Sequence, residues 1–62
     1  MSLVENIKEA CRRNRITVKE MERRAGLPEH STYKWDKTDP GVKRVKRAAD
    51  VLHTTLDELM RE

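Results

Sequence analysis

A glycine between two short helical segments constrains the fold of this chain more than any other feature. Residues 17–25 carry Met21 and Ala25 at helical spacing, and Gly26 follows as the residue that most readily takes the positive φ at which helices end. Pro28 suits the first turn of a further helix, which we expect to reach Trp35 in the core. Two short helices joined by a glycine turn are typical of a helix-turn-helix, which we predict over about 17–35.

The rest of the chain shows the same helical spacing and no convincing strand pattern. Further helices are predicted over about 3–13, 42–52 and 56–61. Three capping boxes, in which Ser or Thr is followed three residues later by Glu, mark helix starts. They are Ser2–Glu5, Thr17–Glu20 and Thr55–Glu58. Asn14 is expected to end the first helix in the left-handed conformation. We therefore predict that residues 1–62 form one compact all-α domain of five helices with a central helix-turn-helix.

The apolar faces of these helices define the expected core. Inward-facing positions are Leu3, Ile7, Ala10, Met21, Ala25, Trp35, Val45, Ala48, Ala49, Leu52, Leu56, Leu59 and Met60. A domain of 62 residues has a stability of roughly a few kcal/mol and little room for a deep catalytic pocket.

Positive charge lies where the predicted motif lies. The formal net charge is +3, and thirteen of the fourteen Lys and Arg residues fall between residues 8 and 47, together with six acidic residues. This distribution favours an acidic partner, and the alternative is the solvated surface of a small soluble protein.

Several classes of protein are not expected. No apolar run approaches the roughly 18–20 residues that span a membrane, and no signal peptide is visible. A single cysteine, Cys11, cannot form an internal disulfide, so we expect a cytoplasmic protein. Cys11, His30 and His53 lack the spacing of zinc ligands, and neither a nucleophile–base pair nor a glycine-rich phosphate loop stands out. We expect no enzyme activity, catalytic residue, metal, cofactor or small-molecule ligand.

A set of short motifs occurs in a characteristic order along almost the whole chain. They are Ile7, Ile16-Thr17, Gly26-Leu27, Trp35-Asp36, Pro40 and Leu56-Asp57-Glu58-Leu59. In this order they resemble the lambda-repressor-like, or Cro/XRE-type, family of bacterial and phage DNA-binding domains. The resemblance implies five helices, of which the third reads the major groove of double-stranded DNA, and a repressor that binds palindromic operators as a dimer. A homodimer would have to use this small surface, helix 56–61 included, and can form on the DNA itself.

The resemblance also implies which residues meet DNA. Base contacts are expected from Glu29, His30, Ser31 and Lys34, and phosphate contacts from Tyr33, Lys37, Lys43 and Arg44. Lysine can donate to guanine O6 and N7, and a carboxylate can accept from cytosine N4. Glu29 can instead complement the dipole of its helix, and Lys34 and His30 can simply be exposed surface residues.

Four positions depart from the family pattern: Cys11, Val18, Glu22 and Thr32. In the family pattern, the position of Cys11 is usually an Arg that pairs with the acidic residue after Trp, and that of Val18 is a Gln that contacts a phosphate. The position of Glu22 is usually a small Ala, and that of Thr32 is a buried Ile or Val. Asp36 thereby loses its arginine partner, and Glu22 is expected to tilt outward or to pair with Lys19 or Arg23.

Three functions remain open. The first is a sequence-specific transcriptional regulator. The second is a protein-interaction module, such as an antirepressor or antitoxin-like partner, that keeps the fold without reading an operator; Val18, Glu22 and Glu29 motivate it. The third is an architectural DNA binder without sequence preference.

Overall fold

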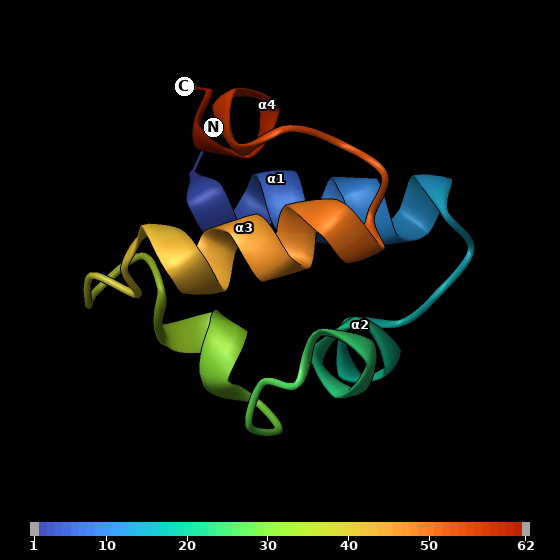
Figure 1. Ribbon diagram of the computed structural model, residues 1–62, viewed down its shortest axis with the longest axis horizontal. Helices are drawn as coiled ribbons and strands as arrows, with labels where there is room; N and C mark the ends of the chain where they lie inside the picture. The colour runs from blue at the N-terminus through green and yellow to red at the C-terminus, as the bar shows by residue number, and fades with distance from the viewer. Residues whose placement is uncertain (1, 62) are drawn as a thin grey trace.

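The computed structural model describes residues 2–61, which form four α-helices and one short 3-10 helix (Figure 1). The elements are α1 Leu3–Arg13, α2 Val18–Ala25, the 3-10 helix η1 Ser31–Lys34, α3 Val42–Val51 and α4 Leu56–Met60. The predicted all-α class is confirmed within this range, which contains no strand. The predicted third α-helix over 28–35 is wrong, because only Ser31–Lys34 is helical there, as a single 3-10 turn.

The helix starts that the capping boxes predict are confirmed. The hydroxyl oxygens of Ser2, Thr17 and Thr55 accept hydrogen bonds from the third backbone N–H of their helices at 3.0–3.1 Å. Each bond satisfies one of the N–H groups that a helix start leaves without an internal partner.

Helix ends follow the prediction at Gly26 but not at Asn14. Gly26 has φ 72°, and the next N–H, of Leu27, donates to the Glu22 carbonyl at 2.8 Å. Asn14 has φ −87°, and Arg15 takes the left-handed conformation instead, with φ 58°. The Asn14 side chain instead forms two hydrogen bonds, because its amide donates to the carbonyls of Ala10 and Leu52 at 2.8 and 3.0 Å.

Buried apolar side chains from the four α-helices and from the connections around η1 meet in one core. Figure 1 shows α1 and α3 both running along the horizontal direction of the view, with α4 above them and α2 and η1 below. Val45, Ala48, Ala49 and Leu52 of the α3 region are buried as predicted, and so is Trp35. The small alanines let α3 approach its neighbours closely.

Met60 is an exception, because it is 54% exposed where we expected it to pack inward. α4 has only five residues, and its buried side chain is Leu59. Successive helical residues point about 100° apart, so the side chain that follows Leu59 turns toward solvent. In the described part of the chain, no helix has the length and apolar character needed to cross a bilayer.

Candidate nucleic-acid interface

The segment between α2 and α3 follows a course that its own sequence did not predict. The Pro28 carbonyl accepts from Ser31 N–H, and the Thr32 carbonyl accepts from Trp35 N–H, both at 3.1 Å. Between them His30 has φ 67°, in the left-handed region. A left-handed residue cannot belong to a continuous α-helix, so helical structure begins only at Ser31.

The carboxylate of Glu22 holds this segment against α2. Glu22 is 1% exposed, and its Oε1 accepts from His30 N–H at 2.9 Å. Its Oε2 accepts from Thr32 N–H at 3.1 Å and from the Thr32 hydroxyl. The expectation that Glu22 turns outward or pairs with Lys19 or Arg23 is therefore wrong. An inward carboxylate is stable here because three donors, two of them backbone N–H groups, converge on it.

The ionisation of Glu22 reflects the same contacts. Burial alone would raise the pKa of Glu22, but the Thr32 hydroxyl and the backbone N–H groups of His30 and Thr32 lower it below its ordinary value of 4.5. Glu22 is therefore a carboxylate at neutral pH. Thr32 is itself buried, so the two unusual positions, 22 and 32, form a polar pair between α2 and η1.

Most of the base-contact residues that the resemblance implies lie at the surface of this segment. Glu29, His30 and Lys34 are exposed, as is Tyr33. Ser31 is half-buried, and its hydroxyl oxygen is enclosed without a hydrogen-bond partner among residues 2–61. Glu29 pairs with Lys19 of α2, with 3.3 Å between Nζ and Oε1.

Lys8 of α1 is a cation that sequence reasoning missed. Its Nζ lies 5.6 Å from the centroid of the Tyr33 ring, over the ring. The His30 ring lies beside Tyr33, with 6.0 Å between centroids. No motif links positions 8 and 33, and only the packing of α1 beside η1 brings these residues together.

The predicted phosphate-contact residues on the next loop and helix are also exposed. Lys37, Lys43 and Arg44 form no ion pair within the described residues, and neither does Lys34. Residues 36–41 connect η1 to the start of α3 on one side of the molecule (Figure 1). The first turn of α3 carries no acidic residue and no side chain caps its start, so the exposed Lys43 and Arg44 lie at a helix N-terminus.

The other two departures from the family pattern have structural explanations. Cys11 is buried in the core, and burial, with a smaller effect of the Glu22 charge, raises its pKa to about 11. Asp36, which lacks an arginine partner, accepts from the Val4 backbone N–H at 3.2 Å and so caps α1. Val18 is half-buried against the core and provides no polar group at the start of α2.

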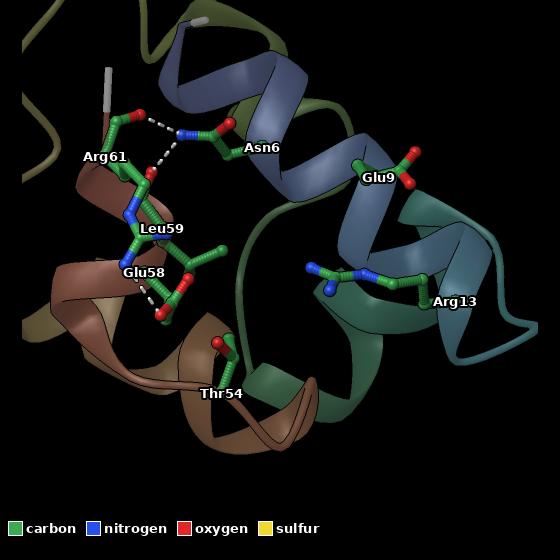
Figure 2. A pocket seen from close by; sticks show the side chains of 7 residues that line it. All are labelled: Asn6, Glu9, Arg13, Thr54, Glu58, Leu59 and Arg61. Atoms are coloured by element: carbon green, nitrogen blue, oxygen red, sulfur yellow. Dashed lines mark hydrogen bonds and ion pairs between the residues drawn. The ribbon is translucent and has the colours of Figure 1, made fainter.

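A shallow groove between α1 and α4 lies on the side of the molecule opposite η1 (Figures 1 and 2). Asn6 closes one end, because its amide donates to the carbonyls of Leu59 and Arg61 at 2.8 and 2.6 Å. Glu9, Glu58 and the guanidinium groups of Arg13 and Arg61 line it, so acidic and basic groups are mixed. Nowhere in residues 2–61 do three His, Cys, Asp or Glu side chains gather as a metal site would require.

The comparisons with known proteins identify a fold. No protein-family model and no curated protein matches the chain. Among solved structures it is similar to the P22 c2 repressor protein, in a crystal structure of its complex with the synthetic operator 9T in the presence of Tl⁺. The TM-score is 0.83 over 98% of this chain and 96% of that chain, at 16% sequence identity. The chain therefore shares the fold of the P22 c2 repressor protein, which agrees with the fold that the order of its sequence motifs implies.

Proposed function

We propose that this protein is a sequence-specific regulator of transcription, a Cro/XRE-type repressor of a phage or bacterium, that binds double-stranded DNA. The observation that carries the proposal is the fold shared with the P22 c2 repressor, a protein solved in complex with operator DNA. Four exposed cations without ion-pair partners in residues 2–61, Lys34, Lys37, Lys43 and Arg44, support it, because they lie on η1, the loop after it and the first turn of α3.

Under this proposal the η1 segment enters the major groove. Lys34 reads a guanine edge, and Glu29 and His30 face neighbouring bases from the turn before η1. Tyr33, Lys37, Lys43 and Arg44 contact phosphates, and the free N–H groups at the start of α3 add to the attraction for an anion. Ser31 can contribute only if its enclosed hydroxyl turns toward the DNA. Two copies of the chain would occupy the two halves of an operator.

Two lysine substitutions test this assignment. Selection of duplexes from a randomised pool should yield inverted half-sites about one helical turn (~10 bp) apart. Lys34→Ala should cost about 1–3 kcal/mol at one base position and relax the preference there, because it removes a base contact. Lys43→Ala should weaken binding equally for all sequences and lower the slope of log affinity against log salt by about 1, because it removes a phosphate contact.

Lys46→Ala is the matched control, since Lys46 also lies on α3 but pairs with Asp50 at 3.1 Å. It should leave both selectivity and salt slope nearly unchanged. Equal effects of the Lys34 and Lys43 substitutions on every sequence would contradict base reading and would leave an architectural DNA binder.

The alternative function is a protein-interaction module on the same fold. The observation that favours it is the replacement of the third α-helix by a single 3-10 turn, with Glu29 next to it and the Ser31 hydroxyl enclosed. Two apolar side chains are also exposed, Val42 of α3 at 66% and Met60 of α4 at 54%. Both line a small hollow, together with Pro40 and Leu56. This function predicts that the selection retains no duplex at moderate salt.

A further inference from the structure

We propose that Glu22 is a positioning residue for DNA reading: its buried carboxylate sets the conformation in which η1 presents its side chains, and so determines selectivity for DNA sequence. This inference rests on the proposed function. It assigns the discrimination between DNA sequences partly to a residue of α2 that has no access to DNA.

η1 has few interactions of its own that would hold its shape. It has only four residues, and 3-10 turns of this length have weak internal hydrogen bonding. The side chain of His30, the N-cap residue of η1, forms no capping hydrogen bond, and His30 itself has the unfavourable φ of 67°. A residue persists in such a conformation only where its surroundings impose it.

Glu22 supplies the restraint that η1 lacks. Its two oxygens bind different residues, Oε1 the N–H of His30 and Oε2 the N–H and hydroxyl of Thr32. Two anchor points two residues apart fix the orientation of the segment as well as its distance from α2. Since Glu22 and Thr32 are both 1% exposed, water does not compete for these bonds.

The helix that carries Glu22, α2, is anchored in the core. Met21, next to Glu22, is fully buried, and Ala25 lies in the core one turn later. The carboxylate therefore has a defined position relative to the whole domain. The angle between the two parts of the helix-turn-helix depends on this polar pair, at positions where the sequence resemblance predicts apolar packing.

The test separates positioning from simple stabilisation. Glu22→Gln keeps the size of the side chain, but its amide nitrogen is a donor and cannot accept from a backbone N–H. Amide hydrogen exchange of His30 and Thr32 in the free protein should become faster. At a temperature where circular dichroism shows the variant fully folded, the affinity ratio between selected and random duplexes should fall about tenfold or more. Glu20→Gln, the same change on the outer face of α2, should alter that ratio less than about twofold.

Thr32 provides a second pair of variants that keep the carboxylate in place. Thr32→Val replaces the hydroxyl with a methyl group and should lower the ratio severalfold, whereas Thr32→Ser keeps the hydroxyl and should leave the ratio close to that of the unsubstituted protein. If Glu22→Gln does not fold, the comparison of these two Thr32 variants still tests the positioning role of the Glu22 carboxylate. An unchanged ratio in folded Glu22→Gln, or equal ratios for Thr32→Val and Thr32→Ser, would overturn the positioning role while leaving the proposed function intact. Failure of the unsubstituted protein to select any duplex would instead refute the proposed function, and this inference with it.

Discussion

Within residues 2–61, three residues other than glycine adopt positive φ, and each lies at a junction between elements. They are Arg15, His30 and His53, with φ of 58°, 67° and 55°. The left-handed conformation costs such a residue roughly 1–2 kcal/mol, because its Cβ crowds the following carbonyl. For a domain whose stability is only a few kcal/mol, these positions matter as much as parts of the core.

Arg15 offers a direct test of this cost. Its N–H donates to the Arg12 carbonyl at 3.1 Å, and its side chain is exposed, so Arg15→Gly removes the crowding without removing a contact in the core. We expect the free energy of unfolding to rise by about 0.5–1 kcal/mol, after allowance for the greater freedom of glycine in the unfolded chain.

Urea unfolding measures this change, and Arg13→Gly is its matched control. Arg13 has a right-handed helical conformation at the end of α1, so the same substitution there should lower stability by about 0.5–1 kcal/mol. A loss of stability in both variants would show that the φ of Arg15 carries no strain.

Among the elements, α4 depends most on its neighbours. Five residues are far too few to form a helix alone in water. The Thr55 hydroxyl closes its start, Leu59 anchors its one buried face, and the Asn6 amide binds the carbonyls at its end. Because Asn6 belongs to α1, the two ends of the described chain are held together (Figure 2).

Asn6→Ala should therefore loosen α4 before the rest of the domain. We expect a loss of about 1–2 kcal/mol, since two carbonyl groups lose their donor. Amide exchange in residues 58–61 should accelerate more than exchange in α2 or α3, and urea unfolding gives the overall loss. Arg13→Ala, at an exposed position of the same helix that forms no ion pair within residues 2–61, should change stability by less than about 0.5 kcal/mol. Uniform acceleration of exchange across all helices would argue against a local role of Asn6.

At the scale of the whole molecule, a single core joins all elements. Residues from α1, α2, α3 and α4 and from the connections around η1 all contribute to it, within overall dimensions of 22 × 21 × 16 Å. We expect unfolding to be cooperative, because no element buries its apolar face without the others.

Cys11 can report this cooperativity. It is 2% exposed, and burial first and the charge of Glu22 second raise its pKa from 9.0 to about 11. The folded state thus favours the neutral thiol, and the resulting stabilisation is complete below pH 9 and is lost as the pH rises through about 11. At pH 8, labelling with a thiol reagent should require global unfolding, since only a thiolate in reach of the reagent reacts.

The measurement is the labelling rate as a function of urea. Its dependence should match that of global unfolding followed by circular dichroism. A rapid rate that does not change with urea would show that α1 opens locally and that the core is less cooperative than its packing implies.

Local sequence patterns are sufficient to predict the features that depend on residues within one helical turn. The hydroxyl oxygens of Ser2, Thr17 and Thr55 each accept a hydrogen bond from a backbone N–H three residues later. Gly26 ends α2 because glycine readily adopts a positive φ. The apolar spacing of α3 likewise placed its buried face correctly. Such interactions form the same way in most surroundings, so the all-α class and most helix boundaries could be predicted.

The tertiary structure is needed to explain hydrogen bonds between residues that lie far apart in the chain. Glu22 turns inward because Thr32 and His30, 10 and 8 residues later, offer donors, and its carboxylate thereby connects η1 and the residue before it to α2. The Asn14 amide donates to the Leu52 carbonyl, 38 residues away in the chain. The Asp36 carboxylate caps α1 by accepting from the Val4 N–H, 32 residues away. Each of these side chains had a plausible local role, and the choice between that role and the distant one depended on which donors and acceptors the packed helices brought within reach.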